Sequence, residues 1–294
     1  MGLFLISSPL FSDIKDYRVC NIPFVYHQQP YLAIRTYTHH YQPWVVAIDC
    51  ITLTPKLLPK TEVIPTQNAF SNLPFQTQLR TDTTPPIRLA NHGVIHQPSS
   101  AFFLTLDLCP SAKPLEKAAL ERLMSLAPNP VPIGIAISGK WLLHHETDLQ
   151  WLQEQVAHHR LDITWINHSF SHPYDAQAPL DHTFLLTPGL SVDAEILDTE
   201  TLLLDRGLVF SPYFRFPGLI ANEACMAKLA DLHLIPLGSD AWLAKGEIPK
   251  PGSIILIHGN GNEPAGIARF LAFLDEHQQD IQTHKLVFGS LSNR

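Results

Sequence analysis

Hydrophobic positions follow one pattern in the first third of the chain and another in the remainder. In the first third, short apolar runs rich in β-branched and aromatic residues, such as residues 31–37 and 44–53, are separated by polar stretches that contain proline. Runs of this kind are typical of β-strands, and the polar stretches are typical of connecting loops. We therefore expect a smaller β-rich N-terminal region over residues 1–98 and a second domain over residues 99–294.

From residue 101 onward, apolar runs of strand length alternate with amphipathic stretches of helical length. This alternation predicts strands at residues 101–106, 133–138, 161–167, 209–215, 234–239, 253–258 and 286–290. It predicts helices at residues 114–126, 146–159, 191–204, 222–232 and 264–277. Strands and helices that alternate in this way form a parallel sheet with helices outside, which is either a barrel or a doubly wound sheet.

Polar side chains lie at or just past the ends of five predicted strands: Asp107, His168, Arg215, Asp240 and His258. In a parallel barrel the carboxyl ends of all strands meet at one face, so these side chains would converge there. The fold class that we predict is therefore α/β, in the form of a (β/α) barrel with a single polar site.

Composition and charge narrow the possible functions. With 45% hydrophobic residues, the 294-residue chain can bury a substantial core. Its net charge of −7 argues against nucleic acid as the main partner. No apolar run reaches the roughly 18 residues of a membrane-spanning helix, and the apolar stretch at residues 2–6 is too short for a signal peptide. Nucleotide binding and serine-hydrolase chemistry have little support, because the sequence contains neither a phosphate-binding loop nor a GxSxG motif.

The four cysteines, at positions 20, 50, 109 and 225, lack the spacing of a structural zinc site. Cys20 and Cys50 could form a disulfide in an oxidising compartment. Equally, they could be buried free thiols.

His168 and His172 form the sharpest motif. They are four residues apart and are followed by Pro173, so they fit on one face of a single turn at the end of a strand. Two imidazoles placed in this way could share one divalent ion. The alternative is a pair of unrelated surface or capping histidines in a chain that contains 16 of them.

The remaining strand-end residues suggest acid–base chemistry. Asp107 could be a general base or a metal ligand, or it could cap a turn. Asp240 and His258 suggest a carboxylate–imidazole pair in which the carboxylate fixes the histidine tautomer, although an ordinary buried histidine is the alternative. Arg215 could pair with Asp107 and lower its pKa, or it could form a surface ion pair.

Taken in this order, the motifs resemble those of the polysaccharide deacetylase family, which are metal-dependent carbohydrate N-deacetylases with a distorted (β/α) barrel. The resemblance covers residues 101–290 and is most specific at Asn167-His168-Ser169-Phe170-Ser171-His172-Pro173. The other matching segments are Thr105-Leu106-Asp107, Phe214-Arg215-Phe216-Pro217-Gly218, Ser239-Asp240-Ala241-Trp242 and Gly252-Ser253-Ile254-Ile255-Leu256-Ile257-His258.

The resemblance implies a role for each of four catalytic residues. Asp107 would be the base that accepts a proton from the attacking water, and His258 would be the acid that protonates the leaving amine. Arg215 would orient Asp107, and Asp240 would tune His258. Aromatic side chains near the motifs could stack on sugar rings, or they could be ordinary core residues; they are Tyr174, Trp242, Phe216, Phe170 and Tyr213.

The resemblance also implies a divalent metal, Zn²⁺ in the first instance, held by His168 and His172. The family's first motif usually carries a second acid that binds the metal, whereas this chain has Leu108 there, followed by Cys109. Because open catalytic zinc sites usually keep three protein ligands, we expect Asp107 to be the third. Two alternatives are that Cys109 or a water completes the site, or that the metal has been lost.

The function that we predict is a metal-dependent hydrolase that removes acetyl groups from N-acetylated sugars of a polysaccharide or peptidoglycan. The alternatives are a catalytically impaired glycan-binding barrel and an amidohydrolase for a small non-sugar amide. An open groove lined by aromatic residues would favour a glycan, and a closed pocket would favour the small amide. Because the family is mostly exported, the resemblance implies a periplasmic, cell-envelope or secreted location. Residues 1–98 could serve as a lid, an oligomerisation surface or a glycan-binding appendage.

Overall fold

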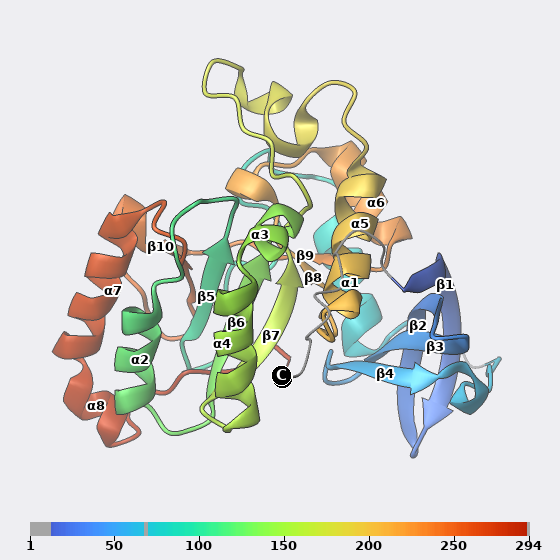
Figure 1. Cartoon of the computed structure of the whole chain (residues 1–294), viewed down its shortest axis with the longest axis horizontal. Helices are drawn as coiled ribbons and strands as arrows, with labels where there is room; N and C mark the ends of the chain where they lie inside the picture. The colour runs from blue at the N-terminus through green and yellow to red at the C-terminus, as the bar shows by residue number, and fades with distance from the viewer. Residues whose placement is uncertain (1–12, 68–69, 293–294) are drawn as a thin grey trace, which may run out of the picture.

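The computed structural model of the chain describes residues 13–67 and 70–292, which form two β-sheets: one has helices along its outside, and the other stands at one end of the molecule (Figure 1). The first sheet is antiparallel, with its strands in sequence order. Its strands are β1 (Ile14–Tyr26), β2 (Gln29–His39), β3 (Gln42–Asp49) and β4 (Pro55–Pro59). A short 3₁₀ turn, η1 (Lys60–Glu62), follows β4.

The second sheet is parallel throughout and has the order β10-β11-β5-β6-β7-β8-β9. Its strands are β5 (Phe103–Leu108), β6 (Val131–Ile137), β7 (Leu161–Asn167), β8 (Tyr213–Phe214), β9 (Ile235–Pro236), β10 (Ala241–Trp242) and β11 (Ile254–His258). The sheet curls into an incomplete barrel, with β10 and β9 as its two edges in the described part of the chain. The predicted α/β class, with a distorted barrel preceded by a β-rich region, is confirmed.

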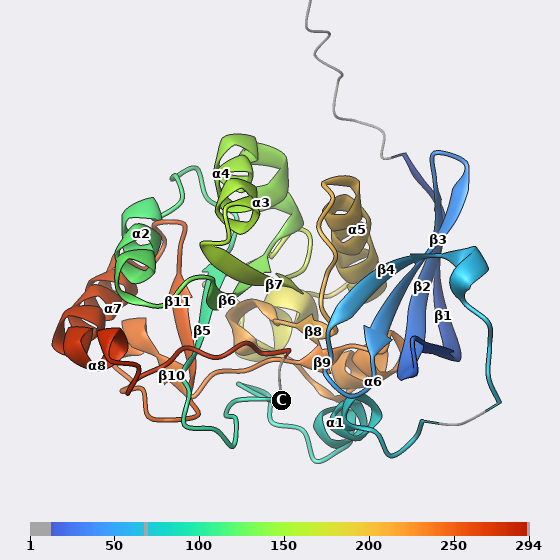
Figure 2. The ribbon, with the colours of Figure 1, turned by 90° about the horizontal axis from the view of Figure 1, so that it is seen from below.

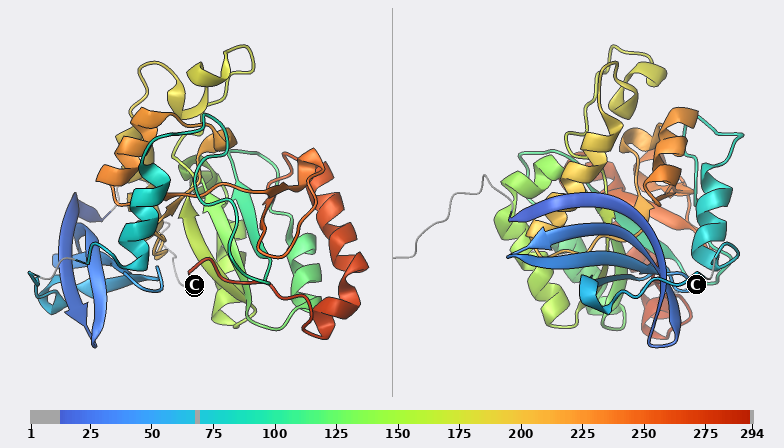
Figure 3. Two further views of the ribbon diagram at one scale, coloured as in Figure 1. Left: turned by 180° about the vertical axis from the view of Figure 1, so that it is seen from behind. Right: turned by 90° about the vertical axis from the view of Figure 1, so that its right-hand side faces the viewer.

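Helices cover the outside of the parallel sheet (Figures 2 and 3). They are α2 (Lys117–Leu126), α3 (Gly139–His144), α4 (Glu146–Ala157), α5 (Val192–Asp205), α6 (Glu223–Asp231), α7 (Pro264–Glu276) and α8 (Gln278–Gln282), and α1 (Pro74–Thr83) packs against α6. The predicted cap of α5 is present, since the Ser191 side chain accepts a hydrogen bond from the Ala194 amide. Short 3₁₀ turns lie in the connections, at η2 (Leu180–His182), η3 (Phe184–Leu186), η4 (Pro217–Leu219) and η5 (Leu243–Lys245). Each helix in residues 13–67 and 70–292 is too short or too polar to cross a bilayer.

The N-terminal sheet is apolar on both faces. Ile34 and Val46 belong to the main core that it shares with the barrel, whereas Ala33 and Val45 belong to a small cluster on the opposite face. The barrel side therefore covers one face of β2 and β3, whereas the cluster on the other face is formed by the strands of the sheet itself and by Val63. The antiparallel sheet stands beside α5 and α6 in Figure 2.

The segment at residues 90–96 lies along the open side of the barrel. Backbone bridges join Val94 to Leu237, next to β9, and His96 to Ser253, next to β11. The Asn91 side chain bonds to both the amide and the carbonyl of Ser239. Residues before the expected boundary at 98 thus contact the edge of the parallel sheet, and the boundary itself stays a prediction.

Several predicted elements differ in length from those observed. The strands expected at residues 209–215 and 234–239 shrink to the two-residue strands β8 and β9. The strand expected at residues 286–290 is a single bridge between Phe288 and Phe102, so that prediction is wrong. Leu286 belongs to the turn after α8, where its backbone amide donates to the Asp280 carbonyl. The start of the predicted strand is therefore part of this turn.

Candidate functional site

The carboxyl ends of neighbouring strands bring four of the predicted residues to one end of the parallel sheet. Asp107 is the penultimate residue of β5 and lies opposite His258, the last residue of β11, in the register of these strands. His168 directly follows β7, and Arg215 directly follows β8. The expected convergence is therefore observed for these four side chains.

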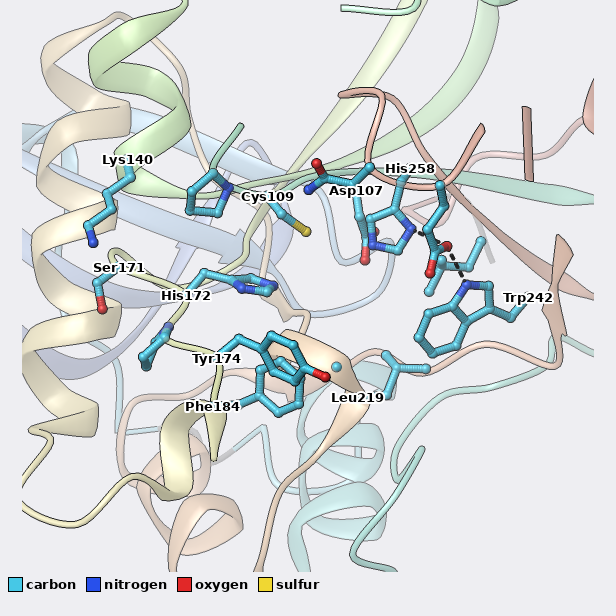
Figure 4. A pocket seen from close by; sticks show the side chains of 16 residues that line it. Asp107, Cys109, Lys140, Ser171, His172, Tyr174, Phe184, Leu219, Trp242 and His258 are labelled. Carbon is cyan, nitrogen blue, oxygen red and sulfur yellow. Dashed lines mark hydrogen bonds and ion pairs between the residues drawn. The ribbon is translucent and has the colours of Figure 1, made fainter. Parts of the chain in front are cut away.

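A cavity of about 680 Å³ opens at this end of the sheet (Figure 4). The residues that line it include Asp107, Cys109, Lys140, His172, Tyr174, Phe184, Trp242, His258 and Glu263. His168 and Arg215 are buried beneath it, with 1% and 0% of their surfaces exposed.

Asp107 lies between Arg215 and His168. Its Oδ1 is 3.6 Å from an Arg215 guanidinium nitrogen, and its Oδ2 is 3.8 Å from His168 Nε2. Arg215 also donates a 2.9 Å hydrogen bond to the Thr105 hydroxyl, which fixes the guanidinium within the sheet. The expected pairing of Arg215 with Asp107 is present.

His168 has the tautomer and charge state that suit a metal ligand. Its Nδ1 lies 2.8 Å from the Arg215 carbonyl oxygen, which can only accept, so Nδ1 carries the proton and Nε2 keeps its lone pair. Burial lowers the pKa of His168, although the charge of Asp107 opposes the shift, and the neutral imidazole is the form that binds metals.

A tight turn at the end of β7 brings His172 to His168, as expected, although its residues are not helical. Ser169 and His172 both have positive φ, 64° and 45°, and the two imidazole centroids are 4.8 Å apart. Glu195 on α5 holds the loop by accepting hydrogen bonds from the Phe170 and Ser171 amides at 2.9 and 2.8 Å and from the Ser171 hydroxyl. Sequence reasoning missed Glu195, which lies more than twenty residues away on a helix.

Cys109, His168 and His172 form a group of potential metal ligands whose donor atoms all lie within 4.8 Å of one another. Cys109 Sγ is 3.5 Å from His168 Nε2. Sulfur and nitrogen bound to one tetrahedral zinc at ordinary bond lengths are about 3.5 Å apart. Asp107, which we expected to be the third ligand, does not belong to this group.

Two histidines act on the thiol of Cys109. Burial raises the pKa of this thiol, but His172, and then His258, outweigh burial and lower it below its ordinary value. Figure 4 shows the sulfur between the rings of these two histidines. The thiolate is the form of cysteine that binds a metal, so this environment suits a ligand.

The carboxylate next to His258 is Glu263, at the start of α7. Glu263 Oε2 lies 2.8 Å from His258 Nδ1, and the same oxygen accepts a 2.8 Å hydrogen bond from Trp242 Nε1. Although burial opposes the shift, Cys109 and Glu263 raise the pKa of His258 to about 10. Sequence reasoning missed Glu263, because its loop looks like a simple turn.

The expected pairing of Asp240 with His258 is wrong, because Asp240 has other partners. Asp240 Oδ2 is instead 2.9 Å from His96 Nδ1, and its Oδ1 accepts a 3.0 Å hydrogen bond from the Ile254 amide. Asp240 follows the predicted strand end, but the segment at residues 90–96 provides its partner.

Some of the predicted aromatic residues line the cavity, and others lie in the hydrophobic core. Tyr174 and Trp242 line the cavity, and Tyr174 is 65% exposed and stacks on Phe184 with centroids 5.0 Å apart. Phe216 is 3% exposed and packs in the core beside α6, so we do not retain it as a substrate-binding residue. Tyr213 is fully buried.

The four cysteines are free thiols, so the possible disulfide between Cys20 and Cys50 is not formed in this structure. Both side chains donate to backbone carbonyls instead, Cys20 to Ala33 and Cys50 to Ile48.

No family model matches this sequence. Among solved structures, a family 4 carbohydrate esterase from Bacillus anthracis is similar, with 17% identity, a TM-score of 0.49 and coverage of 78% of this chain and 94% of its own. Bacillus subtilis PdaA, a family 4 carbohydrate esterase, is 16% identical, with a TM-score of 0.47 and coverage of 77% and 89%. A family 4 pseudoenzyme from Bacillus anthracis is 15% identical, with a TM-score of 0.43 and coverage of 70% and 69%. At these values the chemistry of this chain has to be inferred from its own side chains.

Proposed function

We propose that this chain is a metal-dependent hydrolase that removes acetyl groups from the N-acetylated sugars of a polysaccharide or peptidoglycan. The observation that carries the proposal is the gathering of three potential metal ligands, Cys109, His168 and His172, with a carboxylate, Asp107, and an imidazole, His258, at one cavity. Hydrolysis of an amide needs a polarised carbonyl, a base for the attacking water and an acid for the departing nitrogen. The residues on this face can supply all three.

The donor set fits a catalytic zinc ion. Cys109, His168 and His172 would hold it, and one thiolate with two imidazoles is a set of three protein ligands that leaves a fourth position open. The Arg215 carbonyl, as acceptor of the His168 Nδ1 proton, provides the second interaction that metal-binding histidines ordinarily make. Cys109 thus compensates for the acid that Leu108 replaces.

A bound divalent ion supplies Lewis acidity, which polarises the amide carbonyl and lowers the pKa of a water molecule toward about 7. Asp107 accepts the proton of the attacking water, and Arg215 keeps its carboxylate in place. His258 donates a proton to the nitrogen as the carbon–nitrogen bond breaks. The products are acetate and a free amine.

A glycan suits the cavity wall better than a small amide. Tyr174 and Trp242 present aromatic rings at the cavity, and rings of this kind stack on sugars. The high exposure of Tyr174 indicates a wall that is open to solvent. An N-acetylated glycan of the cell envelope is therefore the substrate that we propose, with a periplasmic, envelope or secreted location.

Metal content tests the proposal without knowledge of the acceptor. We would measure zinc by elemental analysis after dialysis in wild type, His172→Ala and Cys109→Ala, with the exposed His158→Ala as the matched control. We expect about one zinc per chain in wild type and the control, little in His172→Ala, and at least a tenfold weaker affinity in Cys109→Ala.

Acetate release separates the hydrolase from its alternatives. Zinc-loaded wild type should release acetate from N-acetylated oligosaccharides or peptidoglycan. Bound zinc and bound glycan without acetate release would instead support a glycan-binding barrel. Absence of metal in every sample, even after incubation with zinc, would overturn the hydrolytic mechanism.

A further inference from the structure

Glu263 is at the N-terminus of α7, but its side chain contacts residues of the cavity and not the helix. It occupies the N-cap position of α7, where side chains ordinarily accept a hydrogen bond from the first turn, yet its carboxylate makes no such bond in the described structure. One of its oxygens instead faces both the His258 imidazole and the Trp242 indole. The carboxylate thus contacts both His258 and Trp242, which line the cavity and are labelled in Figure 4.

Asp240, which we expected beside His258, is bound to other groups. Both of its oxygens have partners, Oδ2 with His96 and Oδ1 with the Ile254 amide. The His96 backbone is anchored in turn by its bridge to Ser253 beside β11. Reorienting Asp240 toward His258 would break both contacts.

We propose that Glu263 is the positioning residue that orients His258 for proton donation, in place of Asp240. The inference rests on the proposed function, because it assumes that His258 protonates the departing nitrogen. Because Glu263 Oε2 lies 2.8 Å from Nδ1, the other ring nitrogen of His258, Nε2, is the one that we assign as the proton donor. Trp242 fixes the carboxylate by donating to the same oxygen.

Two substrates with different leaving groups test the role. An amide nitrogen must be protonated as it leaves, whereas 4-nitrophenolate leaves without a proton. Glu263→Gln keeps an oxygen for Trp242 but removes the negative charge that faces His258. We expect its kcat for deacetylation of an N-acetylglucosamine oligomer to fall about 10- to 100-fold. We expect KM to stay within about twofold and 4-nitrophenyl acetate hydrolysis within about threefold. Glu263→Asp should recover part of the lost amide activity.

Asp240→Asn is the matched control, and it should leave the ratio of amide to ester activity unchanged. Equal losses on both substrates in Glu263→Gln would overturn the proposal, since they would indicate a structural role alone. A changed ratio in Asp240→Asn with a constant ratio in Glu263→Gln would return the role to Asp240.

A spectroscopic measurement decides the positioning even if no substrate turns over. Two-bond ¹H–¹⁵N spectra report the protonation and hydrogen bonding of each imidazole nitrogen of His258, and His258→Gln identifies its signals. We expect wild type and Asp240→Asn to show an imidazolium with Nδ1 hydrogen-bonded to a carboxylate, and the Nδ1 signals to shift in Glu263→Gln. Unchanged signals in Glu263→Gln would contradict the inference, whereas absence of acetate release by the wild type would contradict only the proposed function.

Discussion

Asp107 lies beside the charged Arg215 and the neutral His168, and each neighbour suits a different task for its carboxylate. Arg215 lies 3.6 Å from Oδ1, where it can orient a base, and His168, one of the three potential metal ligands, lies 3.8 Å from Oδ2. From its position in the sequence, we expected Asp107 to be both the base and the third metal ligand. With the Cys109 sulfur within ligand range of both histidines, the structure offers a separate third donor.

The variant Asp107→Asn separates these tasks. We expect turnover to fall by at least about 100-fold, because the amide cannot accept the proton of water. We expect zinc content to stay near one per chain, because Cys109, His168 and His172 remain. Acetate release and elemental analysis on the same sample measure both, with the exposed Asp162→Asn on β7 as the control. Loss of zinc together with turnover would make Asp107 a ligand after all.

Strand-end residues could be predicted from the sequence, and their partners in loops could not. Asp107 and His258 follow apolar runs, and the geometry of a parallel sheet brings such residues together. Glu263 folds back onto His258 from the loop after β11, and nothing in its spacing marks it. Asp240 was placed at the right strand end, but its partner His96 comes from a distant segment.

Among the elements, α5 supports the site most directly. Its buried Glu195 accepts three hydrogen bonds from the loop that carries His172. Asn167, the last residue of β7 before this loop, donates a side-chain hydrogen bond to the Ile196 carbonyl on the same helix. The helix therefore determines where the loop between His168 and His172 lies.

Truncation of Glu195 tests this support. In Glu195→Ala the two loop amides lose their acceptor, and we expect zinc affinity to fall about 10- to 100-fold. The free energy of unfolding should fall by about 1–3 kcal/mol, because the amides stay partly buried. Competition with a chromophoric chelator measures the affinity, and urea denaturation measures the stability. The exposed Asp198→Ala on the same helix is the control, and equal affinities in both variants would refute the role.

Helices could be predicted more closely than the short strands. The Ser191 cap and the amphipathic pattern after it place the start of α5 where the structure has it. Apolar runs predict β8 and β9 as well, but each run is longer than the two residues that form the strand. Apolar runs report burial, whereas a strand also needs paired neighbours, and β8 pairs with β7 at one position and with β9 at two.

In the molecule as a whole, a buried ion pair joins the N-terminal sheet to the barrel. Arg35 on β2 donates to both carboxylate oxygens of Glu200 on α5, at 2.7 and 2.9 Å, and both side chains are fully buried. Tyr17 on β1 donates to the same carboxylate at 2.6 Å, and Arg35 also donates to the Leu232 carbonyl after α6. The sheet is thus attached by directional contacts as well as by its apolar face.

This attachment could not be predicted from the sequence. The runs that contain Ile34 and Val46 indicate buried strands, but they do not say what buries them. Arg35 lies in the middle of such a run, and its partner is 165 positions away. A charged residue within an apolar run signals a buried partner, because an unpaired buried charge is costly, yet the sequence does not identify that partner.

Breaking the Arg35–Glu200 pair measures how strongly the sheet and barrel depend on each other. Glu200→Gln leaves a buried guanidinium without its counter-charge, so the free energy of unfolding in urea should fall by roughly 3–5 kcal/mol. The exposed pair of Arg122 and Asp275 is the control, and Asp275→Asn should cost less than about 1 kcal/mol. Because apolar replacement removes both buried charges, Arg35→Met combined with Glu200→Leu should be more stable than Glu200→Gln. If Glu200→Gln cost no more than Asp275→Asn, the sheet would be held by its apolar face alone.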